Sequence, residues 1–107
     1  KQHGRIERNF TTGVHVQEID SFIQQYLKLP SSKGAIITDI EKRSAGDMAG
    51  LEVGDVILEV NERVINSRDD ILKVIDESLL KVGDDVALKI WHKNEVEYKK
   101  LRLAERK

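Results

Sequence analysis

The sequence predicts an α+β domain with about six strands, one long helix and two short ones. An almost wholly apolar run at Val56–Val60, within the segment Gly50–Asn61, is typical of a strand that is buried on both faces. Apolar and polar residues alternate over Val86–Trp91, as they do in a half-buried strand. Between Ser67 and Leu80, apolar residues recur on one face of a helix.

The N-terminal half is expected to contain two strands and a short helix. Residues 1–9 are mostly polar and are expected to form a linker or an incoming edge strand. After the turn signal Thr11-Thr12-Gly13, alternating apolar residues over Val14–Ile19 predict a strand. The spacing in Ser21–Leu27 predicts an amphipathic helix, which ends before the single proline because the residue before proline disfavours helical backbone. Ala35–Ile40 is the next predicted strand.

The other elements lie on either side of the apolar run. Before it, residues 41–50 predict a small helical turn, and after it Val64-Ile65 predicts a short strand. Ser67 is expected to cap the long helix, with Asp70 three residues later in the manner of a capping box. A hairpin turn at residues 92–95 joins the last two strands.

The last strand shows a change of apolar phase. Val96 and Tyr98 occupy even positions, whereas Leu101 and Leu103 occupy odd positions. A one-residue slip turns the side chains of a strand to its other face. The change of phase therefore predicts a β-bulge near Lys99-Lys100.

Length and composition describe one globular domain. With 107 residues the chain can bury roughly 60–70% of its unfolded surface and fold without cross-links. The absence of cysteine excludes disulfides and thiolate metal ligands, and a net charge of -1 excludes the basic face that nucleic-acid binding requires. No apolar run approaches the ~18–20 residues of a membrane span. A start at Lys1, without a methionine or a signal peptide, indicates a piece of a longer protein.

Residue types that carry catalysis are present but are not grouped. The histidines His3, His15 and His92 lie far apart, and none has a partner at metal-ligand spacing. None of the six serines lies in a Gly-x-Ser-x-Gly elbow, and no glycine-rich phosphate loop occurs. We therefore expect no catalytic residue, metal or cofactor in this chain.

A glycine turn, a strand and a helix indicate peptide binding instead. The turn Thr12-Gly13-Val14 can direct backbone N–H groups at an anion. The strand that follows and the helix Ser67–Leu80 can form a groove, in which an extended peptide adds to the strand and leaves its carboxylate in the turn. The alternative is an ordinary glycine turn before an ordinary strand, which the turn alone does not exclude.

Two stretches carry a resemblance to a known family. Gly34–Ile40 reads as a glycine followed by an apolar strand, and Ser44–Ile57 contains Ala-Gly-Leu-Glu-Val-Gly-Asp-Val-Ile. Together with the later elements they resemble the PDZ domain of HtrA/DegP-like bacterial serine proteases over Gly13–Leu103, although Ala45 stands where that family has proline. The order of elements is similar to the circularly permuted PDZ arrangement of bacterial proteases. The resemblance implies a PDZ-like, partly open β-barrel or sandwich.

The resemblance also implies domain limits and a binding site. The domain is expected at residues 10–104, with residues 105–107 as a tail. Loop N–H groups would hold a terminal carboxylate, the next strand would pair with the peptide, and two helix residues would line the pocket for the last side chain. Arg68, at the start of the helix, would read the third-from-last ligand residue and favour an acidic or polar one. The expected peptide-binding residues are Thr12, Gly13, Val14, His15, Val16, Arg68, Leu72 and Ile75, of which Leu72 and Ile75 line the pocket.

The residues just before the loop glycine depart from the family pattern. The family usually has a bulky apolar residue where this chain has Thr12, and the stretch Phe10-Thr11-Thr12 is one residue longer than usual. We expect a more polar pocket or a displaced loop, weaker affinity, and Phe10 at the pocket rim. Arg8 either lends charge to the carboxylate site or is a solvated linker residue.

The implied parent protein is a serine endopeptidase of the periplasm or cell envelope. The implied partners are C-termini or unfolded segments of protein substrates and the protease domain of the parent, and the isolated domain is expected to be a monomer. One alternative is the PDZ domain of a site-2 or C-terminal-processing protease, and another is a scaffold module. A Gly-Asn-Ser-Gly-Gly motif upstream would favour the serine protease. A His-Glu-x-x-His motif in a membrane segment would favour the site-2 type, and further PDZ copies would favour the scaffold.

Overall fold

The computed structural model describes residues 10–30, 32–77 and 82–105. Within them, every predicted element is present with ends that shift by a few residues, and the last predicted helical residues, 78–80, lie outside the described part. The elements in chain order are β1 (Phe10–Thr11), β2 (Val14–Glu18), α1 (Ser21–Leu27), β3 (Ala35–Ile40), α2 (Ala45–Met48), β4 (Val56–Val60), β5 (Arg63–Val64), α3 (Arg68–Glu77), β6 (Asp85–His92), β7 (Glu95–Arg102) and β8 (Ala104–Glu105).

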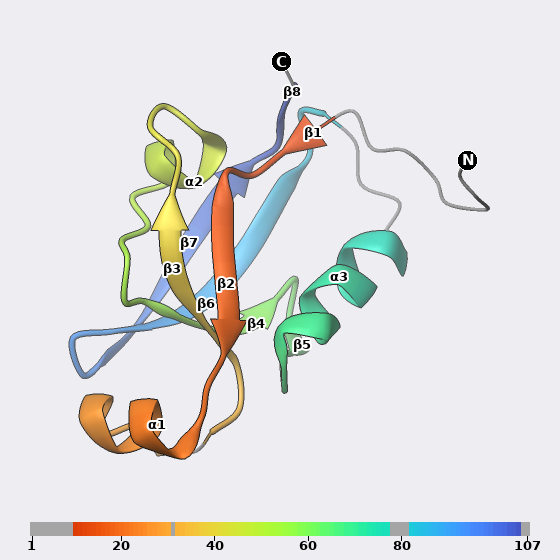
Figure 1. The fold of residues 1–107 in the computed structure, drawn as a ribbon. Coiled ribbons are helices and arrows are strands. Elements are labelled where there is room, and N and C mark those ends of the chain that lie inside the picture. The colour runs from red at the N-terminus through yellow and green to blue at the C-terminus, as the bar shows by residue number, and fades with distance from the viewer. Residues whose placement is uncertain (1–9, 31, 78–81, 106–107) are drawn as a thin grey trace, which may run out of the picture.

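Six of the strands form one antiparallel sheet, in the order β2-β3-β4-β6-β7 with β5 paired to β4. The sheet is open, and β2 and β7 are its end strands in the described part of the chain. Strands β1 and β8 pair with each other and bring Phe10 opposite Glu105. Figure 1 shows α3 beside β2, with α1 and α2 at opposite ends of the β2–β3 pair. This architecture, an open antiparallel sheet with a few short helices, confirms the predicted PDZ-like α+β fold.

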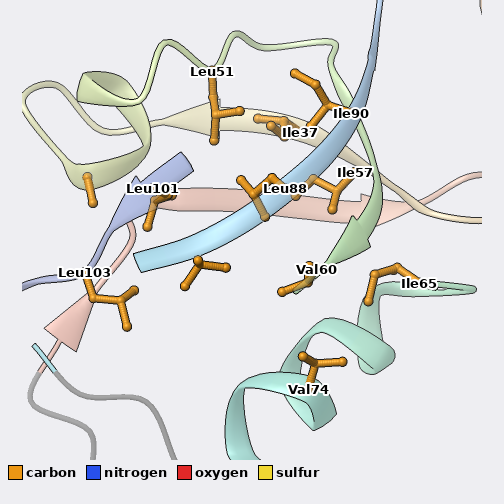
Figure 2. Packing of buried hydrophobic residues seen from close by; sticks show 12 residues of the cluster. Ile37, Leu51, Ile57, Val60, Ile65, Val74, Leu88, Ile90, Leu101 and Leu103 are labelled. Carbon is orange, nitrogen blue, oxygen red and sulfur yellow. The ribbon is translucent and has the colours of Figure 1, made fainter. Parts of the chain in front are cut away.

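Strand β4 has a core on each face, as its apolar run predicts. Val56 is fully buried in a small cluster beneath α1, whereas Ile57 belongs to the main cluster that includes Val74 of α3. A register shift between Ile57 and Glu59 turns Val60 into the same cluster as Ile57 (Figure 2). The strand therefore joins the two cores and supports the cleft described below.

The predicted bulge near Lys99-Lys100 is wrong. Strand β7 pairs with β6 in unbroken register over Glu95–Arg102. Val96 and Tyr98 lie on the exposed face, with 45% and 76% of their surface accessible, whereas Leu101 is buried on the other face. The change of apolar phase comes from two exposed apolar side chains on one face of a regular strand.

Local signals account for the turns and the short helices. The β6–β7 hairpin turns at Lys93-Asn94, which have φ of 49° and 70°, and this confirms the predicted turn. The Asp20 side chain caps α1 by accepting the N–H of Ile23 at 2.8 Å. Ser44 caps α2 by accepting the N–H of Asp47 at 3.2 Å.

Candidate functional site

The outer edge of β2 faces α3 and offers a place for another strand. Strand β2 pairs with β3 along one edge, and among the described residues no strand pairs with its other edge. Helix α3 lies on that second side (Figure 1). An unpaired edge presents N–H and C=O groups that an extended chain can bind.

A cleft of about 250 Å³ opens between β2 and α3. Side chains of β2 and α3 form its mouth, and buried apolar side chains of the main core cluster form its floor. An apolar side chain that enters would be removed from water, which is worth roughly 25 cal/mol per Å² of apolar surface. The lining residues are Thr12, Val14, His15, Val16, Leu51, Ile57, Val60, Arg68, Ile71, Leu72, Val86, Leu88, Leu101 and Leu103.

The turn before β2 has a fixed backbone orientation. The C=O of Thr12 accepts the N–H of Gly46 at 2.9 Å, and the C=O of Gly13 accepts the N–H of Glu41 at 2.9 Å. In a trans peptide unit the N–H points opposite to the C=O. The N–H groups of Gly13 and Val14 therefore point away from α2 and the end of β3, as an anion-binding turn requires.

Two glycines allow this turn to lie against α2. Gly13 has φ +71, and a Cβ on it would lie 2.2 Å from the Cβ of Ser44. A Cβ on Gly46 would lie 2.2 Å from Cγ2 of Val14. Neither distance is possible in a folded protein, so a side chain at Gly13 or Gly46 would displace the turn. Gly13 is one of the expected site residues but Gly46 is not, because its contact joins residues that are distant in the chain.

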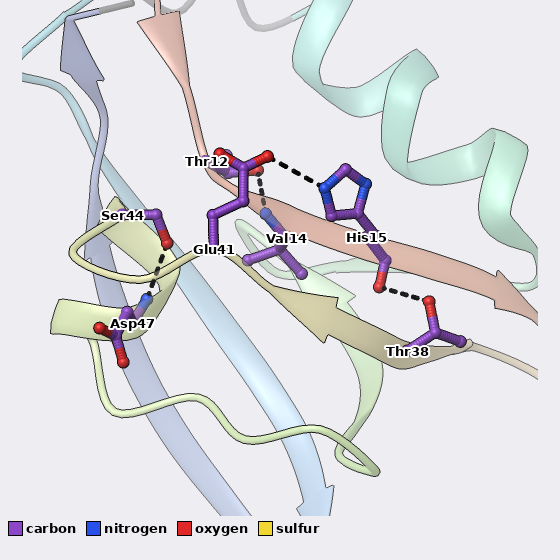
Figure 3. Close-up of polar contacts among 7 residues, drawn as sticks. All are labelled: Thr12, Val14, His15, Thr38, Glu41, Ser44 and Asp47. Atoms are coloured by element: carbon purple, nitrogen blue, oxygen red, sulfur yellow. Dashed lines mark hydrogen bonds and ion pairs between the residues drawn. The ribbon is translucent and has the colours of Figure 1, made fainter.

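The hydroxyl of Thr12 lies at the N–H side of the turn. Its Oγ1 accepts the N–H of Val14 at 3.3 Å (Figure 3). This is longer than the usual 2.9–3.0 Å of an N–H···O bond, so the interaction is weak. An N–H expected to serve a ligand carboxylate thus already has an acceptor from its own loop.

Thr38 orients the middle of β2. The register shifts between His15 and Val16, which pair with Asp39 and Ile37, so Thr38 is the extra residue on β3. Its hydroxyl donates to the C=O of His15 at 3.2 Å (Figure 3). Because the peptide unit is planar, the N–H of Val16 points in the opposite direction, toward the outer edge of β2.

A histidine and a glutamate side chain flank the turn. Nε2 of His15 lies 3.1 Å from Oε2 of Glu41, and both side chains are more than half exposed (Figure 3). The backbone N–H of Glu41 also binds the C=O of Gly13, so this carboxylate belongs to a residue that touches the turn. An exposed pair of this kind adds little to stability, but it places a negative charge beside the turn.

At the other end of the cleft, a side chain of β2 reaches α3. Oε2 of Glu18 accepts the N–H of Arg68, the first residue of the helix, at 3.0 Å. Asp70 accepts the N–H of Asn66 at 2.9 Å, so the expected backward contact of a capping box goes to Asn66, one residue before Ser67. A residue 50 positions away along the chain therefore helps to cap α3.

The structure brings together most of the expected site residues. Thr12, Val14, His15, Val16, Arg68 and Leu72 line one cleft, and Gly13 is buried beneath its end. The expectations for the side chains of Phe10 and Ile75, and for Arg8, lie outside what the structure describes. Sequence reasoning missed Ile71, which lines the cleft beside Leu72, although helical spacing from Arg68 could have indicated it.

Outside the cleft, a buried carboxylate pairs with a histidine. Asp55 is buried and accepts a hydrogen bond from the N–H of Glu52 at 3.0 Å, and its other oxygen lies 2.5 Å from Nδ1 of His92. The hydrogen bond to Asp55 raises the pKa of His92 above its ordinary value of 6.5, although partial burial opposes this. The described residues contain no group of three or more His, Asp or Glu side chains that could hold a metal ion. None of their helices combines the length and apolar character needed to cross a bilayer.

Comparison with known sequences identifies the family of this arrangement. A family model described as PDZ domain matches residues 11–103. The chain is 34% identical over 102 residues to the probable periplasmic serine endoprotease DegP-like of Bartonella henselae, a match that covers 95% of the chain and 20% of the relative. It is 38% identical over 87 residues to the protein of the same description from Chlamydia trachomatis, covering 81% of the chain and 17% of the relative. The chain thus spans about one fifth of the length of these curated relatives.

Solved structures share the fold at lower sequence identity. The HtrA-type protease AlgW with a decapeptide matches with a TM-score of 0.78 and 15% identity, over 92% of this chain and 30% of that one. The HtrA3 PDZ domain bound to the phage-derived ligand FGRWV matches with a TM-score of 0.69 and 17% identity, over 88% of this chain and 84% of that one. An aminopeptidase N family protein from Idiomarina loihiensis matches with a TM-score of 0.74 and 14% identity, over 99% of this chain and 16% of that one. Since the third has a different description, the fold alone does not identify the parent protein.

Proposed function

The chain belongs to the PDZ domain family, and we propose that it binds extended peptide segments by adding them as a strand to the outer edge of β2. The observation that carries the proposal is the outer edge of β2, which no other described strand pairs with and which lies beside an apolar cleft. Backbone hydrogen bonds would supply affinity, and the cleft would select side chains. The orientation of the Val16 N–H, set by the Thr38 contact to His15, supports pairing at this edge.

We further propose a direction for the ligand. A carboxylate at the turn before Val14 would place the ligand C-terminus at the start of β2, so the ligand would run antiparallel to the five residues of this strand. Its last side chain would enter the cleft near Leu72. Farther along, the ligand would pass Arg68, for which we propose a preference for an acidic or polar third-from-last residue.

A titration of the ¹⁵N-labelled domain with the pentapeptide FGRWV, the ligand of the HtrA3 PDZ domain, tests the proposal. We expect NMR shift changes concentrated in residues 12–18 and 68–72. Changes confined to other surfaces would overturn the binding mode. If no member of a wider panel of free C-terminal and internal peptides caused a shift, a structural role would replace peptide binding.

Two matched variants sharpen this test. Leu72 on α3 and Val96 on β7 are each 45% exposed, but only Leu72 lines the cleft. We expect Leu72→Gln to weaken FGRWV binding about tenfold, because an apolar contact of this size is worth about 1–2 kcal/mol. Val96→Gln should leave binding unchanged, and equal weakening by both variants would contradict the proposed site.

We also propose that the parent protein is a serine endoprotease of the periplasm or cell envelope and that this domain captures its substrates. The descriptions of the relatives and the 34% identity to one of them support this proposal. The complete reading frame around this domain tests it, together with labelling of the purified parent by a fluorophosphonate probe. A Gly-Asn-Ser-Gly-Gly motif and covalent labelling are expected. A His-Glu-x-x-His membrane protease or an array of PDZ domains without a protease would overturn it.

A further inference from the structure

An acceptor for one of the loop N–H groups belongs to the protein itself. Thr12 lines the cleft, and its Oγ1 accepts the N–H of Val14, which would otherwise be directed at a ligand carboxylate. The backbone hydrogen bond from the N–H of Glu41 to the C=O of Gly13 keeps the N–H of Val14 pointing in the same direction. A ligand carboxylate would therefore have to displace the hydroxyl or share the N–H with it.

A second observation also disfavours a carboxylate at this position. Glu41 follows β3 directly, and its Cβ would lie 3.4 Å from a Cβ on Gly13. Its carboxylate oxygen lies 3.1 Å from Nε2 of His15 and is more than half exposed. A like charge repels a free carboxylate but not the neutral carbonyl of a peptide that continues beyond the site.

From these contacts we propose that the Thr12 hydroxyl is a specificity-determining group that lowers the preference of the cleft for free C-termini and allows it to accept extended segments inside a chain. The inference rests on the proposed peptide-binding function and names the class of ligand. The hydrogen bond from the Val14 N–H is long and joins uncharged groups. Its displacement therefore lowers the affinity for a free C-terminus by a modest factor and does not block binding. Internal segments bring no terminal carboxylate to the turn, so they can bind without displacing this bond.

The test compares FGRWV with a free carboxylate and the same peptide with a C-terminal amide, by NMR or calorimetric titration. The quantity measured is the ratio of the amide Kd to the acid Kd. In Thr12→Val and Thr12→Ala we expect this ratio to rise about threefold to tenfold, the range that a neutral hydrogen bond of this kind represents. Thr12→Ser retains the hydroxyl and should retain the ratio. Apolar packing of the valine methyl groups against the ligand would strengthen binding of both peptides and cancel in the ratio.

The outcomes separate this inference from the proposed function. If the unchanged domain binds neither peptide, the proposed function fails and this inference fails with it. If both peptides bind but the ratio stays constant or falls in the valine and alanine variants, the hydroxyl is neutral or donates to the carboxylate, and only the role of Thr12 is overturned. Glu41→Gln tests the charge: we expect the ratio to be about twofold higher than in the unchanged domain at low salt, and this difference to shrink in about 0.5 M salt, where the repulsion by Glu41 is screened. No rise at low salt would overturn the contribution of Glu41.

Discussion

At one end of the cleft, backbone hydrogen bonds and two close glycine contacts hold the turn at Thr12-Gly13 against α2. At the other end, the exposed carboxylate of Glu18 reaches across to the first N–H of α3. Backbone contacts cannot be broken by rotating one side chain, whereas an exposed glutamate can swing away at small cost. We therefore expect the turn end to have its shape preset before a ligand arrives, whereas the α3 end can adjust its width.

Gly13→Ala should have the largest effect because it acts on the preset end. A positive φ costs a residue with a Cβ about 1–2 kcal/mol, and overlap with Ser44 adds to that cost. We expect the free energy of unfolding to fall by about 2–4 kcal/mol, with loss of peptide binding. Chemical denaturation and peptide titration measure the two effects.

Gly54→Ala is the matched control for the glycine test. Gly54 also has a positive φ, of +99, but a Cβ there meets no atom within 4 Å. We expect Gly54→Ala to lower the free energy of unfolding only by the conformational cost of about 1–2 kcal/mol and to retain peptide binding. Equal losses in the two variants would show that packing against α2 does not set the turn.

Glu18→Ala should have a smaller effect at the adjustable end. Removing a helix cap typically costs about 1 kcal/mol. We expect faster amide hydrogen exchange at Arg68 and a loss of peptide affinity of about twofold to fivefold, because the start of α3 loses a contact that links it to β2. Gln17→Ala, an exposed neighbour on β2, should change neither quantity. Unchanged exchange at Arg68 in the Glu18 variant would contradict the capping role.

Thr38→Val tests the middle of the strand between the two ends. It retains the shape of threonine but removes the hydroxyl that binds the C=O of His15. The contact is exposed, so water can replace it, and we expect a loss of at most about 0.5–1 kcal/mol of stability and about twofold in affinity. Denaturation and titration check both values. A tenfold loss of affinity would show that Thr38 does more than orient this peptide unit.

His92→Gln should have the smallest effect on the cleft, because His92 pairs with Asp55 outside it. The pKa of His92 is raised in the folded protein, so its ion pair stabilises fully below the unfolded value of 6.5 and is lost as pH rises through the folded pKa. The difference in unfolding free energy between the unchanged domain and His92→Gln should therefore be larger at pH 5 than at pH 9. Peptide affinity should be the same in both, and a pH-independent difference would contradict the ion pair.

Much of the fold follows from local patterns. The apolar run of β4, the alternation in β6 and the amphipathic face of α3 each reflect a periodicity that a short stretch of chain displays. The bulge expected near Lys99-Lys100 failed because a pattern cannot distinguish a slipped strand from exposed apolar residues such as Val96 and Tyr98. The actual register shifts, between His15 and Val16 and between Ile57 and Glu59, depend on partner strands.

The candidate site was partly predictable for the same reason. The glycine turn and the following strand at Val14 are visible in a few consecutive residues, and the resemblance to PDZ domains added the helix residues Arg68 and Leu72. Sequence reasoning did not anticipate the contacts that set the shape of the site. Gly46 beneath Val14 is one of these contacts, and Glu18 on the N–H of Arg68 is another.

The sequence by itself determined the elements of this protein, its family and the presence of a glycine turn before an edge strand. Those features depend on periodicity, turn chemistry and composition, which act over a few residues. Only the tertiary structure decided which backbone groups point toward the cleft and which side chains hold its two ends. It also decided that the Thr12 hydroxyl accepts a hydrogen bond from the N–H of Val14. The physical reason is that α2, β3 and α3 fix these orientations through hydrogen bonds and close packing between residues far apart in the chain.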